Sequence, residues 1–364
     1  MRRVSFIHTG DLHMGRQFHF NSKGDIYGKN KRLDLWETFE KILNTAEKNK
    51  INLLLISGDL FDSDEVDMIE VERVAEKFGR LTQTHVVISA GNHDSYSSVS
   101  LYGLIDWPEN VTLFKTGKLE SVSFPDLETE VYGMSWIKKN YSELPFCPNI
   151  PLDPSRNNIM MLHGDAYAKR TEYLPIQISD FKGFDYLALG HIHKPDILTK
   201  TAAYCGSPEG LNFGEGGTHG VIVGQIKDHE CISQFVPIQK REYIDLSLEV
   251  SPEMSFDGIK EAILSCDTEE KRKINYYRIH LKGYRDPGIS MDWLEDELRG
   301  SFYYFELDDK ELEIDLDIEL LLKENRDNII GKFIQEILRE DKNALSKKAL
   351  YYGLEGILKE KVIL

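Results

Sequence analysis

Five apolar segments of this chain each lead into polar residues of the kinds that bind metal ions. The polar clusters are Asp11-Leu-His13, Gly58-Asp59-Leu-Phe-Asp62, Gly91-Asn92-His93-Asp94, His163-Gly164 and Gly190-His191-Ile-His193. A short apolar run is typical of a buried strand, and the ligand sites of open α/β sheets form at the carboxyl ends of their strands. The pattern therefore predicts an α/β fold in which strand ends bring the five clusters together.

Each cluster alone has an ordinary structural explanation. Asp-Leu-His and His-Gly occur in turns or on surfaces, and Gly-Asn-His-Asp consists largely of common turn residues. Gly-His-Ile-His could be half of a site for a single ion. Five clusters in this order, each after an apolar segment, favour one shared site instead.

The intervening sequence alternates between strand and helix patterns. Residues 31–50 and 68–81 carry apolar side chains on one helical face. Strands are expected at residues 4–8, 52–57, 85–90, 110–114, 130–136, 158–162 and 186–189, and as a hairpin at 220–226 and 231–237. This β-α-β-α-β order predicts a sheet that is covered by helices.

The sequence beyond the last cluster predicts further domains. The strands that could complete the first sheet end near Ile238, so we expect the first domain at residues 1–240. Residues 241–325 mix both patterns and predict a smaller α+β domain, and residues 326–364 predict a helical segment. Its two apolar stripes, at residues 329–338 and 345–358, fit a helical hairpin or a surface for a partner's coiled coil, and we favour the hairpin.

The composition is typical of a cytoplasmic globular protein. No apolar run is long enough to span a membrane, the first residues do not follow the pattern of a signal peptide, and the four scattered cysteines are expected to be free thiols. The net charge of −17 argues against a broad basic surface that coats nucleic acid. It does not exclude action on nucleic acid, because metal-binding carboxylates contribute to that charge and a local channel can still be basic.

The candidate ligands combine carboxylate, amide and imidazole groups. They are Asp11, His13, Asp59, Asn92, His163, His191 and His193. The first two are separated by one residue, as are the last two, so in an extended backbone each pair faces one side and can hold one ion. Asp59 is suited to bridging two ions, because a carboxylate can share its oxygens. A set without thiolates suits manganese, iron or zinc, and two such ions about 3.5–4 Å apart clamp a phosphate and activate water.

His93 is the candidate catalytic residue. It follows Asn92 directly and is expected at the rim of the site, where it can reach the leaving oxygen of a phosphate without binding an ion. We assign it as general acid and phosphate stabiliser. Asp62 and Asp94 are expected to orient nearby histidines.

Several weaker features have two interpretations. The glycine-rich residues 206–220 could contact substrate or form a long turn, and the turn is favoured. Basic residues after the first cluster could meet phosphates or begin a solvated helix; they are Arg16, Lys29, Lys31 and Arg32. Three aromatic residues could stack on bases or pack inside the fold; they are Tyr27, Tyr96 and Tyr102.

With these motifs the chain resembles the calcineurin-like metallophosphoesterase superfamily, in its D-x-H, G-D-x-x-D, G-N-H-[DE], H and G-H-x-H form, over roughly residues 4–238. Four segments are similar to the SbcD-type DNA repair exonucleases, and in particular to their YhaO-like family. The segments are Ile7-His-Thr-Gly-Asp-Leu-His-Met-Gly15, Ser57-Gly-Asp-Leu-Phe-Asp62, Ala90-Gly-Asn-His-Asp94 and Tyr204-Cys-Gly-Ser-Pro208.

The resemblance implies a two-sheet sandwich flanked by helices, followed by a domain that caps DNA. It implies one ion held by Asp11, His13, Asp59 and His193, and a second held by Asp59, Asn92, His163 and His191, with His93 catalytic. Manganese is the first expectation for both ions. DNA is the implied substrate, an SMC-like coiled-coil ATPase the implied partner, and a homodimer the implied assembly.

Three functions are compatible with these motifs. The first is a metal-dependent DNA exonuclease or endonuclease of DNA repair that works with an ATPase. The second is a phosphodiesterase or phosphatase for a small molecule such as a cyclic nucleotide. The third is a non-catalytic adaptor of a repair complex. The intact ligands and His93 speak against the adaptor, and the extra domain favours the nuclease.

Overall fold

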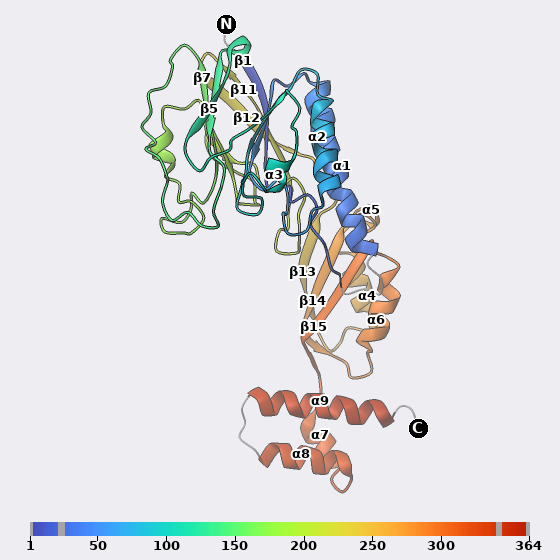
Figure 1. The fold of residues 1–364 in the computed structure, drawn as a ribbon. Coiled ribbons are helices and arrows are strands. Elements are labelled where there is room, and N and C mark those ends of the chain that lie inside the picture. Colours follow the sequence, from blue (N-terminus) through green and yellow to red (C-terminus); the bar gives the residue numbers. More distant parts are fainter. Residues whose placement is uncertain (1–2, 21–25, 340–343, 362–364) are drawn as a thin grey trace. The chain divides into compact units, whose positions relative to one another are not determined.

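The computed structural model describes residues 3–20, 26–339 and 344–361. The chain divides into two compact units, Met1–Glu242 and Tyr243–Leu364 (Figure 1). Among the described residues, no helix is both long and apolar enough to cross a membrane.

Two six-stranded sheets form the first unit, with the orders β12-β11-β1-β2-β3-β4 and β5-β6-β7-β8-β10-β9. The first sheet contains β1 (Arg3–Thr9), β2 (Leu53–Ser57), β3 (His85–Ser89), β4 (Val111–Leu113), β11 (Gly220–Lys227) and β12 (Glu230–Pro237). The second contains β5 (Glu120–Phe124), β6 (Thr129–Gly133), β7 (Asn157–His163), β8 (Tyr186–Gly190), β9 (Asp196–Thr199) and β10 (Ala202–Tyr204). Strands β1 to β4 are parallel, and so are β6, β7, β8 and β10, so each set has its carboxyl ends at one edge.

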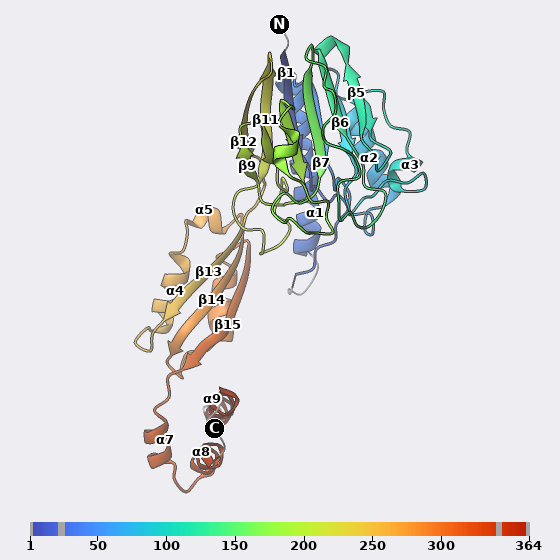
Figure 2. The ribbon, with the colours of Figure 1, turned by 90° about the vertical axis from the view of Figure 1, so that its left-hand side faces the viewer.

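The sheets pack face to face, and the central strands are buried on both sides (Figure 2). In β2, Leu53 and Leu55 belong to the core between the sheets. Leu54 instead packs in a core with α1 (Ile26–Lys48) and α2 (Met68–Gly79). Burial on both faces explains the unbroken apolar run of this strand. The predicted two-sheet sandwich with flanking helices is confirmed, although α1 begins at Ile26 rather than at residue 31.

Long connections, rather than long helices, cover the outer face of the second sheet over the described residues. Trp136 and Tyr141, after β6, and Leu174 and Phe181, after β7, pack in one cluster with Leu187 of β8. Such connections carry no periodic pattern, so the sequence does not predict them. It also does not predict the short strands β5, β9 and β10.

The second unit begins with a three-stranded sheet whose strands are all parallel. Its elements are β13 (Tyr243–Val250), α4 (Phe256–Leu264), α5 (Glu269–Arg272), β14 (Tyr276–Arg285), α6 (Met291–Arg299) and β15 (Tyr304–Ile314). Ile263 of α4 and Leu294 of α6 pack with Ile279 of β14 in the core. The helices are therefore crossover connections between parallel strands.

Three further helices follow, α7 (Ile318–Glu324), α8 (Ile329–Arg339) and α9 (Ala344–Lys361). Buried Ile330 and Ile334 of α8 share one cluster with Leu350 and Leu354 of α9. The two apolar stripes thus pack against each other, as the hairpin interpretation requires. The side chains of Leu345 and Leu358, also predicted in the second stripe, lie outside the described residues.

Candidate metal centre

The candidate ligands lie at the carboxyl ends of five strands from both sheets. Asp11 and His13 follow β1, Asp59 follows β2, Asn92 follows β3, His163 ends β7, and His191 and His193 follow β8. Side chains of the two sheets meet there in groups whose ligand atoms lie within 4.8 Å of one another. One of these groups joins Asp11 and Asp59 of the first sheet to His163 of the second.

The backbone at the site adopts left-handed turns. Asp11, His13, Asp59 and His191 have φ of 51°, 48°, 50° and 96°, a region that costs non-glycine residues about 1–3 kcal/mol each. Backbone hydrogen bonds of 3.0 Å hold the first two turns together, from Asp11 N–H to the Gly58 carbonyl and from His13 N–H to the Asp59 carbonyl. The prediction that Asp11 and His13 converge through an extended backbone is therefore wrong, since tight turns bring them together.

Asp11, His13 and His193 form the first close group. The Nε2 atoms of the two histidines are 3.3 Å apart, and His193 Nε2 is 4.0 Å from Asp11 Oδ1. The other ring nitrogen of His13, Nδ1, is buried and has no hydrogen-bond partner among the described residues. Two imidazole nitrogens and a carboxylate oxygen thus face one small space.

Asp59 lies between this group and a second one. Its Oδ2 is 3.4 Å from His163 Nε2 and 3.7 Å from His13 Nε2. The Asn92 amide oxygen also lies 2.9 Å from His163 Nε2. The Asp59 carboxylate therefore reaches toward ligands of both sheets, and Asp11, whose Oδ1 lies 3.9 Å from His163 Nδ1, is close to ligands of both sheets as well.

His191 contacts the site through its ring rather than through a close ligand atom. Its ring centroid is 5.3 Å from that of His163, and it stacks on Tyr173 at 4.7 Å. Its backbone N–H donates to both Asp11 oxygens at 3.1 Å. Burial lowers the pKa of His191 to about 4, which keeps the ring in the neutral form that binds metals.

His93 and Asp62 form a third group with His13 at the rim. Asp62 lies between the two histidines, with its oxygens 3.9 Å from His93 Nδ1 and 3.8 Å from His13 Nδ1. The His93 side chain is 46% exposed, the most open of the three. Interaction with Asp62 raises the pKa of His93, and the backbone N–H of His93 donates to Asp59 Oδ1 at 2.9 Å.

The buried carboxylates attract positive charge. Burial raises the pKa of Asp11. Burial acts in the same sense on Asp59, but His163 and His13 outweigh it and lower the pKa of Asp59. Burial opposes protonation of His163, yet the carboxylates of Asp59 and Asp11 raise its pKa to about 9. A divalent cation would supply the charge that this proton provides, so the donor set fits metal ions.

Residues 4–195 match the sequence profile of the Calcineurin-like phosphoesterase family. The chain belongs to this family. The match begins in β1 and extends past His193, so it covers all of the candidate ligands of this calcineurin-like phosphoesterase.

Similar proteins extend the comparison at low identity. The chain is 26% identical over 246 residues to an uncharacterized metallophosphoesterase, YhaO, of Bacillus subtilis, covering 64% of this chain and 60% of that protein. It is 24% identical over 260 residues to a subunit of the nuclease SbcCD of Escherichia coli, covering 59% and 62%. It is also 24% identical over 379 aligned positions to the DNA double-strand break repair protein Mre11 of Sulfurisphaera tokodaii, covering 93% and 89%. The matches thus span about three fifths of the first two relatives.

Several supporting residues of this calcineurin-like phosphoesterase are not predicted from its sequence. Glu215 Oε1 lies 3.1 Å from His193 Nδ1. The Trp136 indole donates to the His163 carbonyl at 2.8 Å, and Tyr173 stacks on His191. Each comes from a connection without a periodic pattern, so only the fold brings it to the site.

Some weaker predictions are also decided. Asp94 does not orient a histidine; it accepts hydrogen bonds from the N–H groups of Gly91 and Phe61 and from the Tyr102 hydroxyl. Tyr102 is accordingly buried and packs inside the fold. Lys31 is not a solvated or phosphate-facing cation, since its side chain is fully buried beside Glu209, with the charged atoms 3.2 Å apart.

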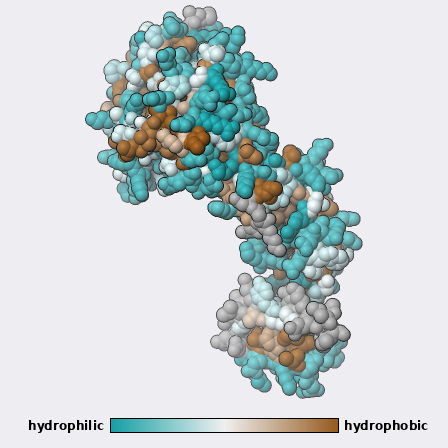
Figure 3. Space-filling model, turned by 45° about the vertical axis from the view of Figure 1, so that its right-hand side comes forward, coloured by the Kyte–Doolittle hydropathy of each residue, from teal (hydrophilic) through white to brown (hydrophobic). Residues whose placement is uncertain are grey.

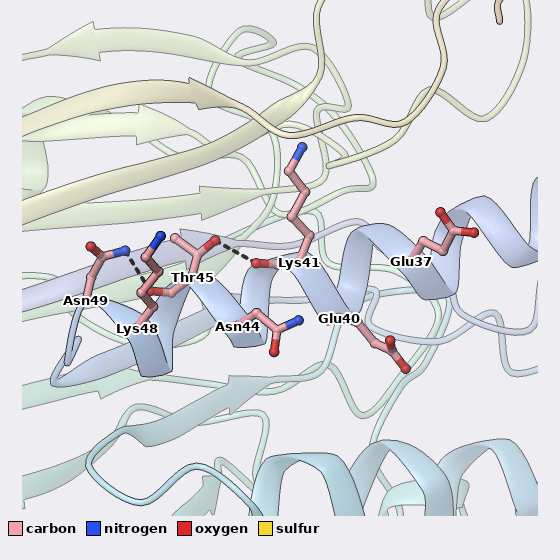
Figure 4. A pocket seen from close by; sticks show the side chains of 7 residues that line it. All are labelled: Glu37, Glu40, Lys41, Asn44, Thr45, Lys48 and Asn49. Carbon is pink, nitrogen blue, oxygen red and sulfur yellow. Dashed lines mark hydrogen bonds between the residues drawn. The ribbon is translucent and has the colours of Figure 1, made fainter.

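A separate hollow of about 490 Å³ lies along α1 (Figure 4). Its lining residues are Glu37, Glu40, Lys41, Asn44, Thr45, Lys48 and Asn49. The Thr45 hydroxyl donates to the Lys41 carbonyl, and the Asn49 amide donates to the Thr45 carbonyl. These bonds stabilise the helix itself, and none of the candidate ligands lines the hollow.

Proposed function

We propose that this calcineurin-like phosphoesterase is a metal-dependent nuclease that hydrolyses phosphodiester bonds in DNA. The observation that carries the proposal is the convergence of carboxylate, amide and imidazole groups beside a half-exposed histidine. Two relatives, one named as part of a nuclease and one as a DNA double-strand break repair protein, support DNA as the substrate. The similarity to the second of these covers 93% of the chain, including the region beyond residue 240.

Two ions are assigned to seven ligands in this proposal. Asp11, His13, Asp59 and His193 would hold one ion, and Asp59, Asn92, His163 and His191 the other. The position of Asp59 Oδ2, within 3.7 Å of His13 and 3.4 Å of His163, supports its bridging role. When bound, the ions would neutralise phosphate charge and activate water. Mn²⁺ is the first candidate, and Fe²⁺ and Zn²⁺ suit the same ligand set.

His93 would donate the proton to the leaving oxygen in this mechanism. Its Nδ1 faces Asp62, which stabilises the protonated ring, and the second ring nitrogen is left for the substrate. Burial of the neighbouring Asp59 and His13 confines exposure to the rim, so His93 is the group that an entering phosphate can meet. The role of Asp62 is therefore to stabilise the proton on His93.

A local basic surface supports a polyanionic substrate despite the net charge of −17. Lys138, Lys139, Lys169 and Arg170 are exposed, and among the described residues no carboxylate forms an ion pair with them. The two segments that carry them are joined by hydrogen bonds of 2.8 Å, from Tyr141 N–H to the Glu172 carbonyl and from Leu174 N–H to the Tyr141 carbonyl. Tyr173, on the second segment, stacks on His191, so this segment reaches the candidate centre. We propose that the cations of the two segments meet backbone phosphates of DNA there.

An SMC-like ATPase is the proposed partner, and a homodimer the proposed assembly. The relative that is named as one part of the nuclease SbcCD supports assembly with another chain. Helices α8 and α9 leave Ile329, Leu338 and Tyr352 exposed, and Figure 3 shows apolar residues among the hydrophilic surface of the second unit. The domains proposed for this assembly are residues 1–240, 241–325 and 326–364.

End-labelled duplex and single-stranded DNA test the proposal. The purified chain is incubated with Mn²⁺, with Mg²⁺ and without metal, beside a chromogenic phosphodiester. We expect Mn²⁺-dependent loss of nucleotides, and the label reports its direction. Hydrolysis of the chromogenic ester together with intact DNA, both with and without the ATPase partner, would contradict DNA as the substrate.

A further inference from the structure

The carboxylate of Glu215 contacts one candidate ligand from a loop that the proposed chemistry does not use. Glu215 belongs to residues 206–219, between β10 and β11, and its side chain is 17% exposed. Its Oε1 lies 3.1 Å from His193 Nδ1. By contrast, Nδ1 of His163 faces the Ser57 carbonyl, and Nδ1 of His13 has no hydrogen-bond partner among the described residues.

This contact determines which nitrogen of His193 is available to a metal. A carboxylate accepts hydrogen bonds only, so Nδ1 must carry the proton that it donates to Glu215. The Nε2 lone pair is then free. That atom lies 3.3 Å from His13 Nε2 and 4.0 Å from Asp11 Oδ1, inside the first close group.

The surroundings of Glu215 require a carboxylate. Its Oε2 accepts from Leu211 N–H at 3.1 Å and from the Ser207 hydroxyl at 3.4 Å, and its Oε1 also accepts from the Asn212 amide at 2.9 Å. All of these neighbours act as donors. A glutamine has only one accepting oxygen at this position. In either orientation of its amide, the NH₂ group would face a hydrogen-bond donor, so at least one donor would lose its acceptor.

We propose that Glu215 is a positioning residue that fixes the ring and tautomer of His193 for one of the two metal ions. The inference rests on the metal centre of the proposed function. Carboxylate partners of metal-binding histidines orient the ring and raise its basicity, and their loss weakens metal binding about 10- to 100-fold. The glycine-rich loop is thus a long turn that also supports the site.

Calorimetric titration with Mn²⁺ of the full chain, after removal of metal, tests this role. We expect two ions for the unchanged chain. In Glu215→Gln one ion should bind about 10- to 100-fold more weakly while the other is unaffected, and Glu215→Asp should recover part of the loss. The matched control is Asn212→Ala, which removes one loop contact to the same oxygen but keeps the carboxylate, and it should bind both ions normally.

Two results would overturn the inference. One is normal binding of both ions by Glu215→Gln. The other is an equal loss in Asn212→Ala, because loop packing would then explain the effect. Since the readout is metal binding, a chain that binds two ions but leaves DNA intact contradicts the proposed function and not this role of Glu215.

The tautomer of His193 gives an independent readout. In metal-free protein labelled with ¹⁵N-histidine, nuclear magnetic resonance should find the proton of neutral His193 on Nδ1. Glu215→Gln should shift the population toward the Nε2–H form. An unchanged tautomer would contradict the role of Glu215, whatever the effect on stability.

Discussion

At the scale of single residues, the site depends on charges held away from water. Asp11, Asp59 and His163 are almost completely buried, whereas His93 keeps nearly half of its side-chain surface. The buried groups suit ion binding and the exposed group suits proton transfer to a substrate. This difference in exposure separates the proposed role of a ligand such as Asp59 from that of His93.

Replacing His93 should remove turnover without removing metal. His93→Ala is expected to lower kcat for a chromogenic phosphodiester by about 10²- to 10⁴-fold, because general acid catalysis contributes that range. Mn²⁺ titration should still find both ions, since His93 is not among the proposed ligands. Full activity of this variant would contradict the catalytic assignment.

The pH dependence of kcat should identify Asp62 as the carboxylate that holds the proton on His93. A general acid must be protonated, so activity falls as pH rises through its pKa. Asp62 raises the pKa of His93, and Asp62→Asn should therefore move the alkaline limb of the kcat profile to lower pH. An alkaline limb at the same pH in both proteins would show that Asp62 does not hold this proton.

His8 should make the fold sensitive to acid. It is buried between the Tyr186 and Ser57 hydroxyls, each 3.0 Å away, and burial lowers its pKa to about 3 from the usual value of 6.5. Between these values only the unfolded state binds the proton, so the free energy of unfolding should decrease as pH falls, by up to about 1.4 kcal/mol per pH unit. Urea unfolding of metal-free protein at several pH values should show that the free energy of unfolding depends less on pH in His8→Gln. An equal pH dependence in both proteins would contradict the assignment of this effect to His8.

At the scale of elements, the strand ends bring the candidate ligands together because the turns that follow the strands pack closely against one another. A Cβ atom built on Gly91, after β3, would lie 2.2 Å from Asp59 Oδ1, and one built on Gly58, after β2, would lie 2.2 Å from His163 Nδ1. Because glycine has no Cβ atom, the turns after different strands can lie close enough for their candidate ligands to meet. The sequence indicates that turns occur here, but only the fold identifies what each glycine contacts.

Gly91→Ala tests this close packing. The added methyl group should displace the Asp59 carboxylate and weaken Mn²⁺ binding at least about tenfold, as expected for a disturbed ligand shell. The matched control is Gly300→Ala in the second unit, where a Cβ atom would have nothing within 4 Å. Unchanged Mn²⁺ affinity in Gly91→Ala would contradict the account of the turns.

The sequence predicts the elements with regular patterns and the residues that follow them. The apolar runs of β2, β7 and β8 predict both the strands and the polar groups at their ends, because burial on both faces leaves a clear pattern. The left-handed turns at Asp11 and His13, and the approach of Glu215 and Tyr173, depend on contacts between distant segments. The local sequence pattern contains no information about such contacts, so they could be identified only from the structure.

At the scale of the whole molecule, the proposed nuclease has to attract DNA although its chain carries a net charge of −17. We propose that the exposed basic residues of segments 138–139 and 169–170 provide the local positive charge for this contact. Local charge rather than net charge governs contact with phosphates at physiological salt, because screening limits electrostatic interactions to about 8 Å.

Charge reversal should show whether these local basic residues, rather than the net charge of the chain, determine DNA binding. Lys169→Glu with Arg170→Glu should weaken DNA binding and reduce the slope of log affinity against log salt by about 1 for each lost phosphate contact. The control, Lys48→Glu with Lys50→Glu, makes the same change in net charge just before β2, at the opposite end of that strand from Asp59. Equal effects of both pairs in fluorescence anisotropy would indicate that net charge alone matters.

The most direct test of the central claim, a two-metal centre bridged by Asp59, is the amount of Mn²⁺ bound per chain at equilibrium dialysis. We expect two ions for the unchanged protein, and loss of both at the same Mn²⁺ concentration in Asp59→Asn, because one carboxylate serves both sites. A single ion in the unchanged protein, or two ions retained in Asp59→Asn, would contradict the account.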